Sequence, residues 1–255
     1  MRLANRAAVL TGAANGIGAA TARRFSEEGA SVVVADLDEA AGTALVSEIV
    51  ETGGKAVFAN CDVAERADLE AAFDLCSSRF GRLDILFNNA AIQDTRGILD
   101  TTDEDFDMLV RVNLRSVFIG IREAARRMID HGNGGSIINT SSTFAIVGSP
   151  GYAAYHTTKG GVSSLTRGAA INLMEHGIRV NAICPGTIDT PGLRLGAAKT
   201  AADPEAAMRS YLSLQPMKRF GKPIEIANTV LFLASDEASF VTGENLVADG
   251  GYTVV

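Results

Sequence analysis

Short apolar runs rich in β-branched residues alternate along the chain with longer segments of helical periodicity. These runs are AAVLTG, SVVVAD, KAVFANCDV, LDILFNNA, GSIINTSS and IRVNAICPG. Continuous apolar runs are typical of strands buried on both faces, and their alternation with helices predicts a parallel sheet. Because crossover connections are right-handed, helices should cover both faces of that sheet. The pattern predicts one α/β domain over residues 1–255, built on a doubly wound parallel sheet in three layers.

Composition and charge exclude several classes of function. The 255 residues carry a formal net charge of -7 and contain no basic block, which argues against a nucleic-acid partner. Three widely separated cysteines predict neither a disulfide framework nor a zinc site, so we expect no metal. No apolar stretch reaches the ~18 residues of a membrane span, and the N-terminal apolar run is too short for a signal peptide. We therefore expect a cytoplasmic protein that acts on a small molecule.

The glycines that follow the first apolar run predict a phosphate-binding turn. In TGAANGIG, Gly12 can form a tight turn, Gly16 can let backbone N–H groups approach a pyrophosphate, and Gly18 can allow close packing of helix on strand. The positive end of the following helix would face the phosphates. Strand-to-helix turns also use glycine for purely structural reasons. The position of the turn, directly between a strand and a helix, favours dinucleotide binding.

The second apolar run ends in a carboxylate, Asp36, which bears on the choice of cofactor. At that position a carboxylate can accept hydrogen bonds from the ribose hydroxyls of an adenosine, and it repels a 2′-phosphate. Leu37 follows rather than arginine, and Asn15 stands in the glycine turn where a basic residue could lie. These residues predict NAD in preference to NADP. The structural alternative is that Asp36 caps the next helix.

The segment GSPGYAAYHTTKGG places two tyrosines and a lysine on one predicted helix. Tyr155 and Lys159 are four residues apart and therefore neighbours on one helix face. A free phenol has a pKa of about 10, too high for a base near neutrality, but an adjacent ammonium group stabilises the phenolate and lowers that pKa. Tyr152 lies near the same stripe and also forms an i, i+4 pair with His156. The spacing predicts a catalytic phenol but does not choose between the two tyrosines.

Taken together, the motifs resemble those of the short-chain dehydrogenase/reductase family in its single-domain branch. The matching motifs are TGAANGIG, Asp62 in CDV, NNAA at 88–91, Asn113 in VNL, the serine pair Ser141 and Ser142, YHTTK, PGTIDT and DGG. They occur in the family's order and cover nearly the whole chain. The resemblance implies a Rossmann-type fold, and hydride transfer between a nicotinamide cofactor and a secondary alcohol or ketone.

The resemblance also assigns catalytic roles. The family's base is a tyrosine with a lysine four residues later and a serine 13 residues earlier, which selects Tyr155, Lys159 and Ser142. Counted from Tyr152, the serine position would hold Asn139, which the apolar pattern predicts to be buried. Ser142 would donate a hydrogen bond to the substrate oxygen, and Lys159 would also bind the nicotinamide ribose. The family's fourth catalytic residue holds a water that links the lysine to solvent.

The resemblance assigns this fourth catalytic position to Asn113. It also assigns residues to the cofactor site, and the sequence departs from the family pattern at two positions. The implied cofactor-binding residues are Gly12, Asn15, Gly16, Ile17, Gly18, Asp36, Leu37, Asp62, Val63, Asn88, Asn89, Ala90, Ala91, Tyr155, Lys159, Pro185, Gly186, Ile188 and Thr190. At Ala91 the family usually has glycine, and alanine is tolerated there if φ is negative. At His156 serine is common, and we expect packing on the helix face rather than a catalytic role.

The substrate is less defined than the cofactor. The implied substrate-binding residues are Gln93, Ser142, Phe144, Tyr152, Tyr155, Arg194 and Arg209. The C-terminal third looks like the branch of hydroxybutyrate and sugar-acid dehydrogenases, in which arginines contact a carboxylate. Arg194 or Arg209 could do so here, or both could be solvated helix charges. We expect a small hydroxy acid, sugar or polyol, and a substrate lid at about 190–219, with a plain surface loop as the alternative.

Three other functions remain open at this stage. A 3-oxoacyl-thioester reductase is the nearest alternative, although it usually prefers NADP, which Asp36 disfavours. A non-catalytic NAD-binding regulator could keep the glycine turn, but here the proton-transfer residues are present too. A nucleotide-sugar epimerase would show a different glycine spacing and a longer C-terminal part. The family usually forms homodimers or homotetramers through its two long helices, here about 103–131 and 152–176, and its C-terminal strand.

Overall fold

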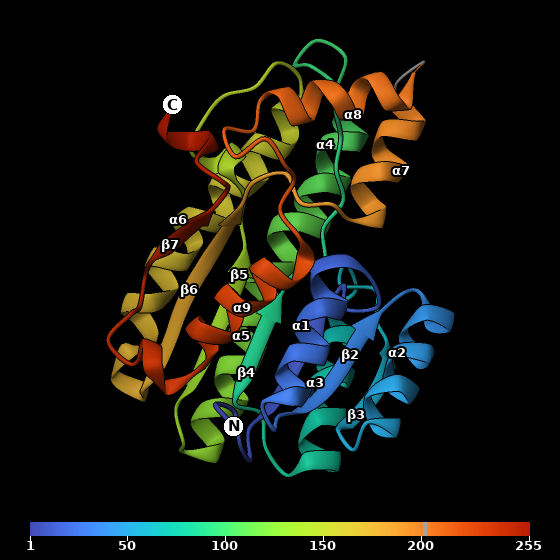
Figure 1. Cartoon of the computed structure of the whole chain (residues 1–255). Coiled ribbons are helices and arrows are strands. Elements are labelled where there is room, and N and C mark those ends of the chain that lie inside the picture. Colours follow the sequence, from blue (N-terminus) through green and yellow to red (C-terminus); the bar gives the residue numbers. More distant parts are fainter. Residues whose placement is uncertain (201–202) are drawn as a thin grey trace.

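In the computed structural model, which describes residues 1–200 and 203–255, seven parallel strands form one sheet in the order β3-β2-β1-β4-β5-β6-β7 (Figure 1). The strands are β1 (Ala7–Thr11), β2 (Ser31–Asp36), β3 (Lys55–Asn60), β4 (Ile85–Asn88), β5 (Gly135–Thr140), β6 (Ile178–Pro185) and β7 (Asn245–Ala248). The α-helices are α1 (Gly16–Glu27), α2 (Glu39–Glu51), α3 (Arg66–Phe80), α4 (Asp103–Val110), α5 (Ser116–His131), α6 (Ala153–Leu173), α7 (Pro191–Thr200), α8 (Pro204–Ser213) and α9 (Pro223–Ala234). The predicted doubly wound sheet is confirmed.

Helices cover both faces of the sheet, which explains why its strands are apolar without alternation. Neighbouring valines of β2 point into opposite cores. Val33 packs with Phe73 under α3, α5 and α6, and Val32 packs with Phe25 under α1, α2 and α9. A strand buried on both sides has no solvent-facing positions, so its sequence reads as one continuous apolar run.

The centre of the sheet is the place where the chain reverses its direction of winding. β1 and β4 are neighbours there, and the two halves of the sheet extend outward from them. The loops that follow these two strands therefore diverge, and in open α/β sheets ligands bind in the crevice that this leaves beyond the carboxyl ends. Figure 1 shows α7 and α8 beyond the same edge of the sheet.

Most of the described residues in the segment 190–219 belong to the two helices α7 and α8 rather than to an irregular loop. Residues 201 and 202, which fall inside the predicted lid, lie outside the described residues. Pro204 occupies the start of α8 and Asp203 caps it by accepting from Ala206 N at 3.0 Å. The position of this helical pair agrees with a lid, and the lid function stays a prediction.

The long helical segment predicted from Asp103 to His131 is continuous, but its middle has a different hydrogen-bond pattern. α4 passes at Arg111–Arg115 into a π-helical turn, which continues as α5. Single π turns inside α-helices are frequent at functional sites. Asn113 lies at the centre of this turn and is completely buried.

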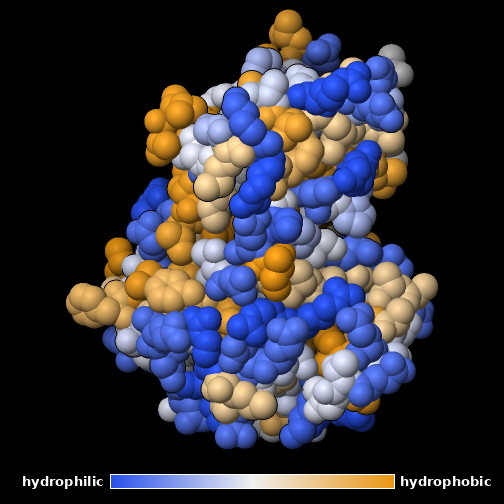
Figure 2. Space-filling model, viewed as in Figure 1, coloured by the Kyte–Doolittle hydropathy of each residue, from blue (hydrophilic) through white to orange (hydrophobic). Residues whose placement is uncertain are grey.

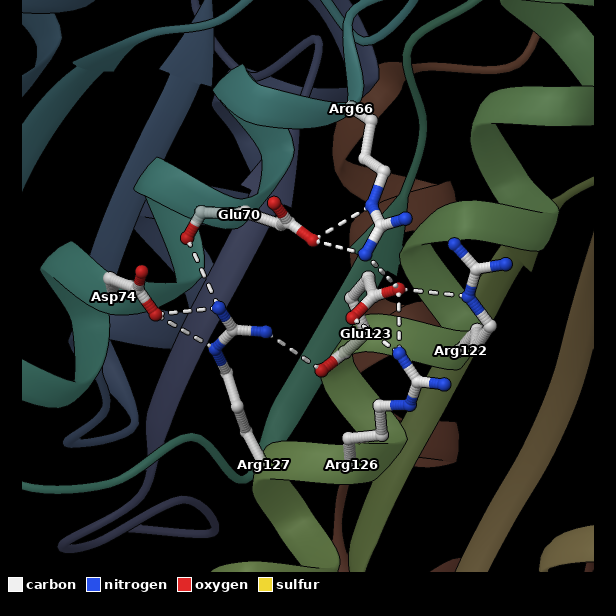
Figure 3. Close-up of polar contacts among 7 residues, drawn as sticks. All are labelled: Arg66, Glu70, Asp74, Arg122, Glu123, Arg126 and Arg127. Carbon is white, nitrogen blue, oxygen red and sulfur yellow. Dashed lines mark hydrogen bonds and ion pairs between the residues drawn. The ribbon is translucent and has the colours of Figure 1, made fainter.

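An ion-pair cluster joins α3 to α5 (Figure 3). The buried carboxylate of Glu123 on α5 lies 3.3 Å from Arg66 of α3, 2.8 Å from Arg122 and 3.2 Å from Arg126. Burial alone would raise the pKa of Glu123, but the three guanidinium groups outweigh burial and hold the pKa below its usual value. The cluster therefore keeps a charged carboxylate at the contact between these helices.

The surface is unevenly divided between polar and apolar residues. Figure 2 shows a largely hydrophilic lower part around α1, α2 and α3, and apolar residues gathered at the upper left beside the C-terminus. The exposed apolar side chains include Phe240, Val254 and Val255. Among the described residues, none of the helices has the length and apolar character needed to cross a membrane.

Gly18 and Gly168 provide a matched test of packing at the glycine turn. A Cβ at Gly18 would lie 2.1 Å from the carbonyl oxygen of Gly12, whereas at Gly168 nothing beyond the adjacent helix backbone lies within 4 Å. We expect Gly18→Ala to lower the free energy of unfolding by about 3 kcal/mol, because backbone atoms must move apart. Gly168→Ala should raise it by up to about 1 kcal/mol, since alanine favours a helix. Urea denaturation measures both, and equal stability of the variants would contradict this packing.

Candidate active site

The glycine turn after β1 is shaped by left-handed backbone and by close approach to the loop after β4. Gly12 and Gly16 have φ of 59° and 54°, a conformation that favours glycine. A Cβ at Gly12 would lie 2.7 Å from Cα of Ala90. Asn89 fixes the turn from the other side, because its Nδ2 donates to the carbonyl oxygens of Gly12 at 2.9 Å and Thr11 at 3.2 Å. Asn89 therefore holds the turn in place.

The start of α1 can receive an anionic group. Asn15 is the N-cap residue, and its side chain makes no capping hydrogen bond, so it does not occupy the N–H groups of the first turn. Those N–H groups and the helix dipole are what a pyrophosphate requires. Thr190 faces the turn from the loop before α7, since a Cβ at Gly16 would lie 3.2 Å from its Cγ2. The turn therefore fits the dinucleotide predicted from the sequence.

The carboxylate of Asp36 ends β2 and points to the glycine turn. Its Oδ2 accepts from Ala14 N at 2.9 Å and its Oδ1 accepts from Asp38 N at 3.0 Å. The alternative that Asp36 caps the next helix is wrong, because Asp38 is the N-cap of α2 and accepts from Ala41 N at 3.0 Å. Asn15 joins this corner by donating from Nδ2 to Asp38 Oδ2 at 3.3 Å.

The remaining cofactor candidates line the same edge of the sheet. Asp62 and Val63 follow β3, and Ala90 and Ala91 follow β4. Pro185 ends β6, and Gly186 and Ile188 follow it. Among the described non-glycine residues, only Asn5, Tyr152 and Lys218 have a positive φ. Ala91 therefore has a negative φ, which allows alanine where the family usually has glycine. The cofactor-binding roles of these residues stay predictions.

Asn113 anchors the loop that follows β4. Its Oδ1 accepts from Ile92 N at 2.8 Å, and its Nδ2 donates to Ile92 O at 2.8 Å and to Thr158 Oγ1 at 3.4 Å. A buried amide that bonds both backbone groups of one residue fixes that residue's position. Asn113 therefore connects the π-helical turn, the β4 loop and α6. Its part in a proton relay stays a prediction.

Tyr155 lies on α6 with a buried phenol, and the side chains of Gln93 and Ser142 are close enough to act on its pKa. Burial raises the pKa of Tyr155 above its usual value, while the polar groups of Gln93 and Ser142 act to lower it because they favour the phenolate. Gln93, predicted from the sequence only as a substrate contact, is thus a partner of the phenol. The structure brings together Tyr155, Ser142 and Gln93, which lie far apart in the chain.

Lys159 is buried behind the phenol. Its Nζ donates to Thr140 O at 2.8 Å and lies 5.5 Å from the centroid of the Tyr155 ring. Burial lowers the pKa of the Lys159 ammonium to about 8. From the i, i+4 spacing, the lysine is predicted to lower the pKa of the phenol directly. In the polypeptide alone, burial dominates and raises it, so the ammonium is near the ring without offsetting the desolvation of the hydroxyl.

Tyr152 forms an aromatic wall with two other side chains. Its ring lies 5.1 Å from that of Phe144, and its hydroxyl is close to Tyr211 of α8. Burial, followed by the nearby Tyr211 hydroxyl, raises the pKa of Tyr152 above its usual value. Tyr211 is not among the residues predicted from the sequence. The available signal was an aromatic residue within the predicted lid, close in the chain to Arg209.

The spacing argument against Tyr152 as the base agrees with the structure. Asn139, which stands 13 residues before it, is completely buried. Its Oδ1 accepts from Asn88 Nδ2 at 2.9 Å and its Nδ2 donates to Thr166 Oγ1 at 3.0 Å. Asn139 therefore links β4, β5 and α6 inside the core and has no place beside a substrate.

The two arginines predicted to contact a substrate carboxylate are engaged within the chain. Arg194 forms a bidentate pair with Asp189, with both nitrogen–oxygen distances at 2.8 Å. Arg209 lies 3.6 Å from Asp203 and 3.6 Å from Glu205. Both side chains are largely exposed. The role in carboxylate binding stays a prediction, and it would require breaking these pairs.

Comparison with known proteins settles the family. A family model described as "Enoyl-(Acyl carrier protein) reductase" matches residues 12–253. The 2,5-dichloro-2,5-cyclohexadiene-1,4-diol dehydrogenase LinX of Sphingobium indicum is 41% identical over 253 residues, covering 99% of this chain and 98% of that protein. The crystal structure of a short-chain type dehydrogenase/reductase from Mycobacterium marinum has a TM-score of 0.93 at 34% identity, covering 99% and 97% of the two chains. The chain belongs to the short-chain dehydrogenase/reductase family.

A second relative gives the class of reaction. The cyclopentanol dehydrogenase of Comamonas is 38% identical over 252 residues, covering 99% of this chain and 98% of that protein. The resemblance inferred from the motifs is therefore confirmed. As a member of the short-chain dehydrogenase/reductase family, the protein is an oxidoreductase of the alcohol-dehydrogenase type, and proteins of this family use nicotinamide cofactors.

The buried ammonium of Lys159 should make stability depend on pH. Its pKa is about 8 in the folded chain, against an ordinary value of 10.5 in the unfolded chain, so between these pH values only the unfolded chain keeps the proton. Stability conferred at this position therefore rises with pH from about 8 upward. Between pH 7 and 10 we expect the free energy of unfolding to rise by about 2 kcal/mol relative to Lys159→Met. Parallel denaturation curves measure this, and a pH-independent difference between the two proteins would contradict it.

Proposed function

We propose that this protein is an NAD-dependent dehydrogenase of cyclic secondary alcohols, with Tyr155 as the general base. The observation that carries the proposal is the buried phenol of Tyr155, with the polar side chains of Gln93 and Ser142 beside it and the Lys159 ammonium 5.5 Å from its ring centroid. Donors directed at a phenol oxygen stabilise its ionised form. The phenol lies at the carboxyl edge of the sheet, where a substrate can reach it.

Each group of the site has a defined part in alcohol oxidation. A bound nicotinamide dinucleotide supplies the acceptor for the hydride that leaves the substrate carbon. The Tyr155 phenolate takes the hydroxyl proton as the carbonyl double bond forms, so charge and atoms balance. Ser142 donates a hydrogen bond to the same substrate oxygen, and the positive charge of Lys159 stabilises the phenolate. In the reverse direction Tyr155 returns the proton to the carbonyl oxygen.

Asp36 supports NAD over NADP. Two backbone N–H groups hold its carboxylate above the glycine turn, from Ala14 and Asp38. The lone pairs that remain on the carboxylate can accept from both ribose hydroxyls, and its charge repels a 2′-phosphate. Leu37, the next residue, is an exposed apolar side chain and offers no cation to a phosphate. The same carboxylate argues against the NADP-preferring thioester reductase.

Two observations support a ring-shaped apolar substrate over a hydroxy acid. Arg194 and Arg209, the candidates for binding a carboxylate, are already paired within the chain. Aromatic side chains border the site: Phe144 meets Tyr155 edge-on, Tyr152 packs on Phe144, and Tyr211 of α8 is close to Tyr152. Aromatic faces bind apolar rings well. Two relatives named above are dehydrogenases of a cyclohexadiene diol and of cyclopentanol, which agrees with this class.

We also propose that the protein acts in the cytoplasm as a homo-oligomer. Phe240, Val254 and Val255 are exposed apolar side chains. Figure 2 shows apolar residues gathered beside the C-terminus. Apolar surface of this kind favours contact with a second copy. The cysteines Cys61, Cys76 and Cys184 are free thiols, which suits a reducing compartment.

The choice between the two tyrosines gives the sharpest test of the base. Tyr155→Phe should lower kcat for oxidation of cyclic secondary alcohols about 10²- to 10⁴-fold, the usual contribution of a general base. Tyr152→Phe removes an equivalent hydroxyl three residues earlier and should change KM more than kcat. NADH absorbance across cyclic alcohols, hydroxy acids, sugars and polyols measures both variants. Equal loss in the two variants, or turnover of hydroxy acids alone, would contradict the proposal.

The cofactor preference is tested at Asp36. Asp36→Ala removes the charge that repels a 2′-phosphate, so the ratio of kcat/KM with NAD to that with NADP should fall at least about tenfold. The substitution also removes the acceptor for Ala14 N. Thermal unfolding of the variant therefore serves as the control for loss of structure. An unchanged ratio in a folded variant would count against the assignment of NAD.

A further inference from the structure

His156 follows Tyr155 on α6 and contacts the short 3-10 turn at Thr143–Ala145. Its ring stacks on that of Phe144, with centroids 4.7 Å apart and planes inclined by 26°. Its Nδ1 lies 2.6 Å from the carbonyl oxygen of Phe144. Because a carbonyl oxygen can only accept, Nδ1 carries the proton and donates. The His156 side chain thus contacts both the ring and the backbone carbonyl of Phe144.

Phe144 in turn fixes the hydroxyl of Ser142. The N–H of Phe144 donates to Ser142 Oγ at 3.1 Å, and the N–H of Ala145 donates to Ser142 O at 3.0 Å. Because one lone pair of Ser142 Oγ receives the N–H of Phe144, the hydroxyl proton is free to point to the phenol of Tyr155, whose pKa Ser142 acts to lower. The Phe144 ring meets Tyr155 edge-on, with centroids 6.2 Å apart.

These contacts form a chain from His156 through Phe144 to Ser142 and Tyr155. We propose that His156 is a positioning residue: by fixing the 143–145 turn, it orients the Ser142 hydroxyl towards the phenol of Tyr155. The proposal rests on the proposed function, in which Ser142 and Tyr155 act on the substrate oxygen. His156 itself touches no reacting atom. Its Nε2 is buried without a hydrogen-bond partner within the described residues, so Nδ1 and the ring face account for its hold on the turn.

Two substitutions test the hydrogen bond of His156 and its aromatic ring independently. His156→Phe keeps an aromatic face against Phe144 but removes the donor to its carbonyl oxygen. His156→Asn loses the ring but places an amide N–H donor near the position of Nδ1. Thr157→Ala is the matched control, since Thr157 is the next residue on α6 and is exposed. All variants are compared as full-length protein for folding by circular dichroism.

Hydrogen exchange of residues 142–147 provides a readout that does not depend on activity. In His156→Phe we expect amide exchange in this segment to accelerate at least about tenfold, with His156→Asn and Thr157→Ala close to wild type. In steady-state assays His156→Phe should lower kcat about tenfold with little change in the KM for NAD, because misplaced catalytic groups cost rate. His156→Asn should restore kcat to within about twofold of wild type.

The possible results separate this proposal from the proposed function. Unchanged exchange at 142–147 in His156→Phe overturns the anchoring, whatever the activity. Accelerated exchange with unchanged kcat overturns the link to Ser142, and so does a failure of His156→Asn to restore kcat. If wild-type protein oxidises no cyclic alcohol, the proposed function fails, and the exchange data still decide whether His156 fixes the turn.

Discussion

Two hydrogen bonds at Lys159 join the carboxyl end of β5 to α6, and the geometry of the site depends on them. Lys159 Nζ donates to Thr140 O at 2.8 Å, and Ser141 Oγ donates to Lys159 O at 2.9 Å. Lys159 lies one helical turn after Tyr155, so fixing the lysine fixes the phenol. Ser142 follows Ser141 in the chain. The strand end and the helix therefore bring the serine and the tyrosine together without a flexible element between them.

Burial determines the electrostatics at this junction. Water is excluded from both the phenol and the ammonium, which raises the pKa of Tyr155 and lowers that of Lys159. Both pKa shifts arise because burial disfavours the charged form of each group. The polar side chains of Gln93 and Ser142 oppose the shift of the phenol. The phenol is therefore neutral at pH 7 in the polypeptide alone, and under the proposed function it would ionise once further positive charge is bound beside it.

The sequence predicted those features that depend on neighbouring residues. A strand buried on both faces is a continuous apolar run, as in SVVVAD, and a left-handed turn requires glycine, as at Gly12. Contacts between distant loops were not predictable in this way. Tyr211 reaches Tyr152 only because α8 folds over the sheet edge. Local spacing also could not show that Asp38, rather than Asp36, caps α2.

The charges and aromatic residues around the site illustrate the same limit. From the sequence, Arg194 and Arg209 could bind a substrate carboxylate or lie in solvent. Their ion pairs with Asp189 and Asp203 could not be predicted from the sequence. His156 looked like a packing residue, and it does pack on Phe144, but its bond to the Phe144 carbonyl depends on how the turn at 143–145 meets α6. The four residues that the resemblance assigns to catalysis could be named from the sequence because they recur at family spacing, and their roles stay predictions.

The ionisation of Tyr155 can be measured directly by NMR of protein labelled with ¹³C at the tyrosine hydroxyl carbon, with Tyr155→Phe used to assign the resonance. In the protein alone the phenol should titrate above the free value of about 10. With saturating NAD⁺, whose nicotinamide is positively charged, its pKa should fall by at least about one unit. The account would be contradicted if Tyr155 titrated below 10 without NAD⁺, or if its pKa did not change when NAD⁺ bound. Either result would mean that burial and bound positive charge do not control the ionisation of this phenol.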